Sequence, residues 1–265
     1  RYEQAFLQYV ARFRPDAVPQ VIWSAPDADY FCMEYLDGFS TWKDDLLAGQ
    51  FDRRLAQAAG TLLGEIHERS WEDAAAERQF DSTENFDQLR IDPYLRAAAG
   101  EQPVVAEPLH TEATRLRNTR RCLVHGDFSP KNLLHRDGRL VVVDCEVAWY
   151  GDPAFDLAFL LNHLFLKALY HVPRADRLLD LVDGAKVAYE TANTHAGTML
   201  AGAARLLPML MLARVDGKSP VEYLTLDTQR QAVRKFAIAQ ICRAAPLPLA
   251  SLAEAWGEYL TKVDS

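Results

Sequence analysis

The sequence predicts an α+β fold: a small mixed segment followed by a mostly helical body that carries one short β-hairpin. Strand-like runs are confined to residues 21–35 and 122–143, whereas apolar residues recur at helical spacing through most of the remaining chain. The 265 residues are 49% hydrophobic and 25% charged, which is enough apolar material for a globular core. We expect a small lobe over 1–36 and a larger helical lobe over 37–265.

The elements of the small lobe follow from periodicity and turn residues. Residues 1–14 are predicted to form an amphipathic helix that ends before Pro15 and Pro19. Two short strands are expected at 21–23 and 30–35, joined by the turn-forming segment Ser24-Ala25-Pro26-Asp27.

The helical body begins after Asp52, a suitable N-cap for a helix whose apolar residues are spaced through 55–66. Residues 71–100 are acidic and weakly periodic, and we expect a solvated insertion with short helices there in preference to a substrate lid. A helix from Pro153 to about Tyr170 is apolar nearly all round and is therefore predicted to be buried. Residues 174–265 are expected to be helical.

Charge and cysteine content exclude several classes of protein. The net charge of −8 argues against binding to a nucleic-acid backbone and permits a cationic small substrate. The four cysteines are scattered without a CxxC pair, so we expect neither a disulfide framework nor a zinc site, and a reducing, cytoplasmic setting fits. The most apolar stretch, Met199 to Val215, is interrupted by Arg205, Pro208 and Arg214, so no membrane span or membrane partner is expected.

The residues that carry chemistry lie between 122 and 156. A strand at 122–124 leads into the loop His125-Gly126-Asp127-Phe128-Ser129-Pro130-Lys131-Asn132, and a hairpin follows with strands at 133–135 and 139–143. Because a tight hairpin returns the end of its second strand to the start of its first, Asp144 should lie near Asp127 and Asn132. Oxygen ligands without His or Cys favour a hard cation such as Mg²⁺, which keeps room for water and phosphate oxygens. The pattern therefore indicates phosphoryl transfer.

The order His125-x-Asp127-x4-Asn132, then Asp144-x-Glu146, then Gly151-Asp152-Pro153-x-x-Asp156 resembles the aminoglycoside phosphotransferase and choline kinase-like family. These are small-molecule kinases with a protein-kinase-like, two-lobe fold. The resemblance implies an enzyme that uses ATP and Mg²⁺ to phosphorylate a hydroxyl group of an aminoglycoside-, choline- or sugar-like molecule. ATP rather than GTP is the default expectation. Acids in 71–100 and near the C-terminus (Glu254, Glu258) would suit a cationic acceptor.

The family's site residues carry over onto the matching positions. Asp127 would be the catalytic residue that orients the acceptor hydroxyl and takes its proton, while Asn132 and Asp144 would hold Mg²⁺. Met33-Glu34-Tyr35-Leu36 resembles the hinge that contacts adenine, which makes Glu34, Tyr35 and Leu36 cofactor-binding residues. Lys131 would either reach a phosphate group or be solvated.

Three further residues are expected to support the site. His125 should pack and hydrogen-bond to hold the catalytic loop. Asp156 lies early in an apolar helix and needs partners, for which backbone N–H groups of the catalytic loop are expected. Glu146 stays open between a place beside the metal and the surface. His67 is expected to be a packing histidine.

The sequence departs from the family at its beginning. It has no Gly-rich loop ahead of the hinge, since its first glycine is Gly38, and the strand lysine that would pair with Glu3 is missing. The small lobe is therefore predicted to be truncated: either the chain is part of a longer kinase, or the protein lacks its phosphate clamp. In the second case the alternative is a non-catalytic nucleotide- or metabolite-binding protein. A metal-dependent hydrolase built on His125 and Asp127 is disfavoured because no further His completes a metal site.

Overall fold

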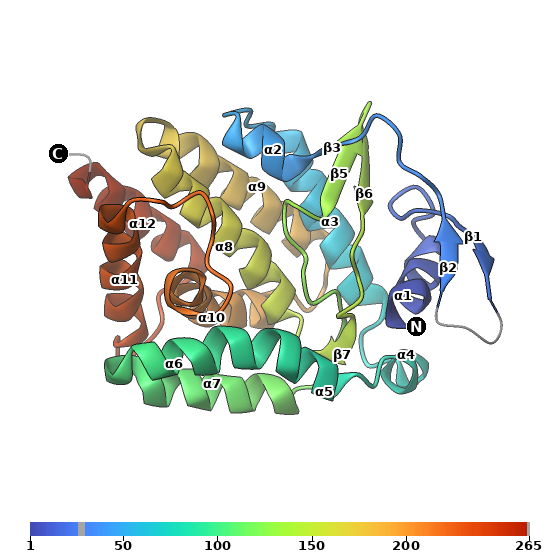
Figure 1. The fold of residues 1–265 in the computed structure, drawn as a ribbon, viewed down its shortest axis with the longest axis horizontal. Helices are drawn as coiled ribbons and strands as arrows, with labels where there is room; N and C mark the ends of the chain where they lie inside the picture. The colour runs from blue at the N-terminus through green and yellow to red at the C-terminus, as the bar shows by residue number, and fades with distance from the viewer. Residues whose placement is uncertain (26–29, 264–265) are drawn as a thin grey trace.

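A central helix, α8 (Ala154–Tyr170), organises the larger part of the chain. In the computed structural model, which describes residues 1–25 and 30–263, every residue from Ala154 to Leu169 is buried. Helices α9 (Ala175–Ala192) and α10 (Ala196–Asp216) pack against α8, and α3 (Arg53–Arg69) packs along α9. Helices α11 (Asp227–Ile241) and α12 (Leu249–Val263) close the end far from the strands (Figure 1). The predicted α+β fold with a mostly helical body is confirmed.

The N-terminal elements lie together at the opposite end of the molecule (Figure 1). Helix α1 (Tyr2–Ala11) buries an apolar face and ends earlier than predicted, because residues 12–14 turn back onto its last carbonyls. Strands β1 (Val21–Ser24) and β2 (Phe31–Met33) pair antiparallel with a bulge near Val21, and β2 is shorter than the predicted 30–35. Pro26 and Asp27 of the predicted turn lie outside the described residues.

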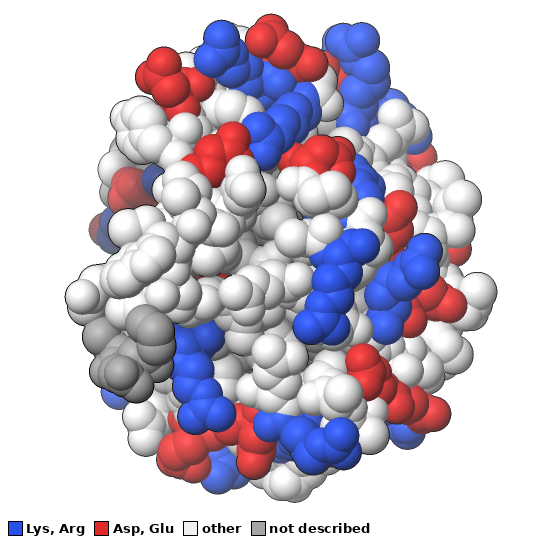
Figure 2. Space-filling view, turned by 90° about the vertical axis from the view of Figure 1, so that its right-hand side faces the viewer, with Lys and Arg blue, Asp and Glu red and all other residues white. Residues whose placement is uncertain are grey.

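The β1–β2 pair carries an apolar surface. Five large apolar side chains are at least 40% exposed on or next to these strands: Ile22, Trp23, Tyr30, Met33 and Tyr35. Figure 2 shows this end of the molecule, where the middle of the face is largely free of charge and charged side chains gather above and below it. An apolar surface of this kind is unusual for a pair of strands in water.

Two small β-sheets hold the predicted catalytic segments side by side. Strand β3 (Ser40–Thr41) pairs with β5 (Leu133–Arg136), which forms the expected hairpin with β6 (Arg139–Val142). Asp137 and Gly138 both have positive φ, as a two-residue hairpin turn of type I′ requires. Strand β4 (Cys122–Val124) pairs with β7 (Trp149–Gly151). The loop after β4 and the loop after β6 therefore lie next to each other.

Local capping explains where the main helices begin. The Asp52 carboxylate accepts a hydrogen bond of 2.9 Å from the Arg54 N–H, so Asp52 is the predicted N-cap of α3. Thr41 caps the short helix α2 (Trp42–Leu47) in the same manner. The Asp152 carboxylate accepts from the Ala154 N–H at 2.9 Å and fixes the start of α8, one residue after the predicted Pro153.

Residues 71–100 are not the solvated insertion that the sequence predicts. They form α4 (Ala74–Gln79), α5 (Thr83–Phe86), the π-helix η1 (Asp87–Arg96) and α6 (Ala97–Glu101), and they bury Phe80, Phe86, Ile91 and Leu95 in the core. The 3₁₀ turn η2 (Pro103–Val105) and the helix α7 (Ala106–Asn118) follow, and Arg117 and Arg120 pair with acids of this segment. The predicted short helices are confirmed. The predicted solvated insertion is wrong, because the acids are partnered at the edge of a packed layer and their number gives no information about the apolar residues beneath them.

One described helix, α10, is long and apolar enough to cross a membrane by length and composition alone. It continues through Pro208, so the predicted interruption of Met199–Val215 is absent. Of its most apolar stretch, 72% is buried inside the fold, as in the core helix of a globular protein. A short 3₁₀ turn, η3 (Val172–Arg174), links α8 to α9.

Candidate active site

The loop between β4 and β5 presents Asp127 beside the end of β6. Gly126 precedes Asp127 with a φ of +79°, and a Cβ at Gly126 would lie 2.7 Å from the Val147 carbonyl oxygen. A side chain is therefore excluded at this position by both backbone conformation and space.

His125 links the catalytic loop to the segment that leads to Asp144. Its Nδ1 accepts a hydrogen bond of 3.1 Å from the Asp127 N–H, and its Nε2–H donates to the Val143 carbonyl at 3.2 Å. The ring also contacts the edges of Phe6 on α1 and of Phe128. Burial lowers the pKa of His125, so the imidazole is neutral at pH 7, as one acceptor and one donor nitrogen require.

Asp156 braces the same loop from below. Its carboxylate is fully buried on the first turn of α8, and it accepts hydrogen bonds from the N–H groups of His125 (2.6 Å) and Gly126 (2.9 Å). These are the backbone partners expected from the sequence. His67 on α3 adds a contact of 3.5 Å to Asp156 and is held by the Tyr189 hydroxyl at 2.9 Å, so His67 is a satisfied packing residue.

Asn132 is held with one end of its amide facing the catalytic loop. Its Nδ2 donates to the Asp127 backbone carbonyl at 3.0 Å, and its own backbone carbonyl accepts from the Val143 N–H at 3.0 Å. Among the described residues, no hydrogen-bond donor reaches its Oδ1. That oxygen is therefore available as a ligand for a hard cation.

Lys131 brings Asp127 and Asp144 together. Its Nζ lies 2.9 Å from Oδ2 of Asp127 and 3.6 Å from Oδ2 of Asp144. Partial burial acts to lower the pKa of Lys131, but the two carboxylates outweigh it and raise that pKa. Lys131 is therefore paired rather than merely solvated, and the hairpin does return Asp144 to the catalytic loop.

Arg90 is a site residue that sequence reasoning missed. From the π-helix η1 its Nε donates to the Gly126 carbonyl at 2.5 Å, while its Nη2 lies 3.2 Å from Oδ2 of Asp127. The Asp127 carboxylate thus lies between two cations, Arg90 and Lys131. No local sequence signal marks Arg90, because it lies 37 residues before Asp127 in the sequence and only the packing of η1 brings it to the loop.

Asp144 lies at the end of β6 with a φ of +62°, a left-handed backbone that Asp tolerates better than most residues. Its side chain is 44% exposed. Burial, together with the nearby carboxylates of Asp144 and Glu146, raises the pKa of Glu3. Glu146 itself is exposed.

The predicted hinge is shaped by an ion pair. Arg139 on β6 holds the Glu34 carboxylate through two bonds of 3.0 and 3.1 Å, which ties the hinge to the hairpin. Tyr35 is 87% exposed and Leu36 is half-buried. Sequence reasoning missed Arg139. A groove of about 680 Å³ lies beside this pair and is also lined by residues of α1.

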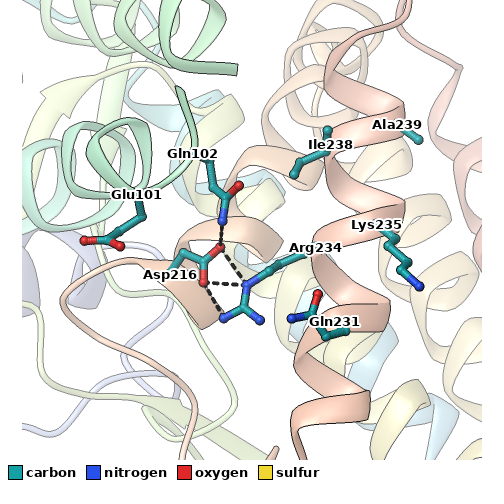
Figure 3. A pocket seen from close by; sticks show the side chains of 8 residues that line it. All are labelled: Glu101, Gln102, Asp216, Gln231, Arg234, Lys235, Ile238 and Ala239. Atoms are coloured by element: carbon teal, nitrogen blue, oxygen red, sulfur yellow. Dashed lines mark hydrogen bonds and ion pairs between the residues drawn. The ribbon is translucent and has the colours of Figure 1, made fainter. Parts of the chain in front are cut away.

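A separate surface hollow of about 650 Å³ lies between α6, the end of α10 and α11, away from the catalytic loop (Figure 3). Asp216 accepts hydrogen bonds there from Gln102 (2.7 Å) and Arg234 (2.8 Å). These groups satisfy one another's hydrogen bonds and hold the three helices together, so the residues around the hollow form a structural junction.

Residues arranged in this manner can hold a cation, position a hydroxyl group and accept its proton. Among the described residues, no group of three or more His, Cys, Asp or Glu side chains could hold a metal ion alone. One carboxylate and one amide form an incomplete set of ligands, which suits a cation that also binds water and substrate oxygens.

Comparisons with known proteins agree with this chemistry. Residues 1–170 match the phosphotransferase enzyme family. Methylthioribose kinases of Pectobacterium atrosepticum and Pectobacterium carotovorum are each 24% identical over 194 residues, covering 63% of this chain and 48% of theirs. The chain thus spans about half the length of the curated relatives it matches. A solved structure of an amicoumacin kinase in complex with AMP-PNP and Ca²⁺ aligns over 99% of this chain and 77% of that one, with 14% identity and a TM-score of 0.54. That likeness shows a kinase-like fold.

Proposed function

This chain belongs to the phosphotransferase enzyme family, and from that membership we propose that it transfers the γ-phosphoryl group of ATP to a hydroxyl group of a small molecule with the help of Mg²⁺. The observation that carries the proposal is the convergence of Asp127, Asn132 and Asp144, which one hairpin brings to a single spot. The kinase-like fold supports it.

The residues present fit a divalent cation. Asn132 and Asp144 would hold it, because Oδ1 of Asn132 is available and the Asp144 carboxylate is half-exposed. When bound, the cation neutralises charge on the transferred phosphoryl group.

Asp127 would orient the acceptor hydroxyl and accept its proton. The ion pairs with Arg90 and Lys131 fix the orientation of the carboxylate. A strong base is not needed where the proton leaves late, because positioning supplies most of the rate acceleration in phosphoryl transfer.

His125 and Asp156 are proposed as positioning residues. Neutral His125 spans the distance between the Asp127 N–H and the Val143 carbonyl, so it sets the separation of the two loops that carry Asp127 and Asp144. Asp156 holds the loop backbone through two charge-assisted hydrogen bonds. Glu34, Tyr35 and Leu36 are proposed to contact the adenine ring through the hinge, and Glu146 to lie at the exposed edge of the metal site.

A second function, a non-catalytic nucleotide- or metabolite-binding protein, is the alternative. Among the 265 residues of this chain, the first lysine is Lys43 and the first glycine is Gly38, so these residues themselves contain neither a lysine nor a Gly-rich loop ahead of the hinge.

The test separates binding from turnover. We expect Asp144→Asn to weaken Mg²⁺-dependent binding of AMP-PNP at least tenfold in titration calorimetry. Asp127→Asn should keep that binding and lower ADP release by roughly 10²–10⁴-fold with methylthioribose, choline, homoserine or an aminoglycoside as acceptor. Asp137→Asn is the matched control, since it removes the same charge from the exposed turn of the same hairpin.

Two outcomes decide between the functions. ADP release that requires an acceptor and Asp127 supports the kinase. Nucleotide binding without turnover, unaffected by Asp127→Asn, would instead support the binding protein.

A further inference from the structure

One face of α8 continues from the catalytic loop into the helical body. Asp156, His163 and Lys167 are separated by seven and four residues, so they lie on the same side of the helix. Asp156 holds the catalytic loop from this face. His163 and Lys167 therefore lie further along the side of α8 that faces the active site.

Four cations, Lys43, Lys131, Lys167 and Arg214, act electrostatically on His163, and we term them the basic cluster. Burial lowers the pKa of His163 well below its usual value, and the charges of all four cations lower it further. Lys131 belongs to the active site through its contact with Asp127. Lys43 adjoins the catalytic loop, because its N–H donates to the Pro130 carbonyl at 2.9 Å. The basic cluster is thus continuous with the site of phosphoryl transfer.

The innermost members of the cluster have no carboxylate partner among the described residues. Lys167 is 1% exposed, and its Nζ lies 4.7 Å from the centre of the Tyr223 ring. Arg214 is 9% exposed and donates only to neutral groups, the Tyr94 hydroxyl (3.0 Å) and Ser219 Oγ (2.9 Å). Glu222 pairs with Lys43 at the exposed rim. Buried cations without an anion are costly, so the cluster is electrostatically incomplete.

Several polar atoms in the residues that form or adjoin the basic cluster are unsatisfied. The Tyr223 hydroxyl, Nε of Arg214, Nε1 of Trp42 and Oγ of Ser129 are buried without a hydrogen-bond partner among the described residues. All four are donors or can donate, and each residue is at least nine-tenths buried. Trp42 adjoins Lys43 in sequence, and Ser129 lies in the catalytic loop. Such orphaned donors call for an acceptor-rich ligand.

The acids that would suit a cationic acceptor are used elsewhere. Within 71–100, Glu72, Glu77, Asp81, Glu84, Asp87 and Asp92 each form an ion pair with an arginine of the same layer. Glu254 lies on α12 and lines a hollow against α9. The electrostatic argument for a cationic acceptor therefore loses its basis.

We propose that the basic cluster is the subsite for an anionic group, a carboxylate or a phosphate, carried by the hydroxyl-bearing acceptor. The proposal rests on the proposed kinase function and names the class of its substrate. The anionic group lies between Lys167, Arg214 and the Tyr223 hydroxyl, while the hydroxyl group of the same molecule reaches Asp127 past Lys131.

The test measures binding to the protein with its nucleotide site filled by Mg²⁺-ADP. Four compounds on one three-carbon skeleton probe the anionic subsite alone, because the eleven residues of α8 between Asp156 and Lys167 span about 16 Å: glycerol, 3-amino-1,2-propanediol, glycerate and glycerol 3-phosphate. We expect glycerate or glycerol 3-phosphate to bind at least tenfold more tightly than the neutral and cationic probes, and the better of the two identifies the anion. Lys167→Met and Tyr223→Phe should weaken this binding, by at least tenfold for Lys167→Met. Lys235→Met, which removes an exposed lysine from α11, should leave it unchanged.

A second readout is specific to Lys167. Burial, with the charges of Lys43 and Arg214, lowers the pKa of Lys167 to about 7, and the Glu222 carboxylate acts to raise that pKa. Tyr223 and His163 are the other titratable neighbours of Lys167. Binding of an anion at pH 7 should therefore take up protons, which calorimetry in two buffers of different ionisation enthalpy detects. Lys167→Met should abolish that uptake.

Either of two results would overturn the proposal: equal binding of the anionic probes to wild type and Lys167→Met, or tighter binding of 3-amino-1,2-propanediol than of both anions. Binding of Mg²⁺-AMP-PNP, measured on the same samples, separates this failure from failure of the kinase function. Anion binding without nucleotide binding would retain the subsite and refute the kinase.

Discussion

Replacing Asp156 with Asn tests whether one buried carboxylate holds the catalytic loop. The carboxylate accepts from two backbone N–H groups, at 2.6 Å from His125 and 2.9 Å from Gly126, and it is fully buried. An asparagine of the same shape keeps one acceptor oxygen and turns an NH₂ group towards the other N–H. One charge-assisted hydrogen bond, about 1.5–3 kcal/mol, is lost, and one buried donor is left unpaired at about 1–3 kcal/mol. We expect the free energy of unfolding to fall by about 3–5 kcal/mol.

Urea denaturation followed by circular dichroism measures this loss. Glu258→Gln, which neutralises an exposed carboxylate on α12, is the control and should change the free energy of unfolding by less than about 0.5 kcal/mol. The folded fraction of the Asp156→Asn protein should also release ADP more slowly, since the loop is no longer held. A loss of stability below about 1 kcal/mol for Asp156→Asn would refute the reasoning, because it would mean that the loop backbone does not depend on the carboxylate.

Two further predictions concern backbone space and titration. In urea denaturation, Gly126→Ala should lower the free energy of unfolding by about 2 kcal/mol more than Gly138→Ala does. Both glycines have a φ near +80°, but only at Gly126 would a Cβ lie 2.7 Å from a carbonyl oxygen. Equal losses in the two variants would contradict this. Burial, with Lys43 and Arg214, lowers the pKa of Lys167 to about 7, so between that value and its unfolded pKa the folded state binds fewer protons and stability rises with pH. Relative to Lys167→Met, wild type should gain about 2 kcal/mol from pH 7 to pH 9 in urea titrations, and parallel curves would exclude a buried, shifted lysine.

The sequence predicts the hairpin and its consequences because they are local. Asp137-Gly138 requires a type I′ turn, the turn fixes the register of β5 and β6, and the register returns Asp144 to the loop of Asp127. The caps at Asp52 and Asp152 are equally local, since each carboxylate accepts a hydrogen bond from the backbone N–H two residues later, at the start of a helix. In each of these cases the interacting residues lie within about twenty residues of each other in the sequence, so their spacing is enough to predict that they meet.

The residues that sequence reasoning misses are those whose partners are remote. Arg90 reaches Asp127 from a π-helix, and no spacing rule anticipates either the helix type or the direction of its side chains. In the sequence, Arg139 is only one of the alternating residues of a hairpin strand, and no nearby residue indicates its ion pair with Glu34. A weak signal did exist for the basic cluster: His163 and Lys167 stand four apart in a helix that is otherwise apolar nearly all round. Polar residues on one face of a buried helix require partners, and the same argument that identifies Asp156 applies to them.

The common support of the two subsites has a mechanical consequence. Asp156 fixes the catalytic loop from the first turn of α8, while His163 and Lys167 lie two and three turns further along the same face. A helix buried on all sides bends and slides little, so the distance from the loop that Asp156 holds to Lys167, eleven residues along α8, is set by the helix rise of about 1.5 Å per residue. Under the proposed function, this rise would define how far the phosphorylated hydroxyl group lies from the anionic group of the acceptor. Acceptor length, more than acceptor flexibility, would then determine which compounds the enzyme phosphorylates.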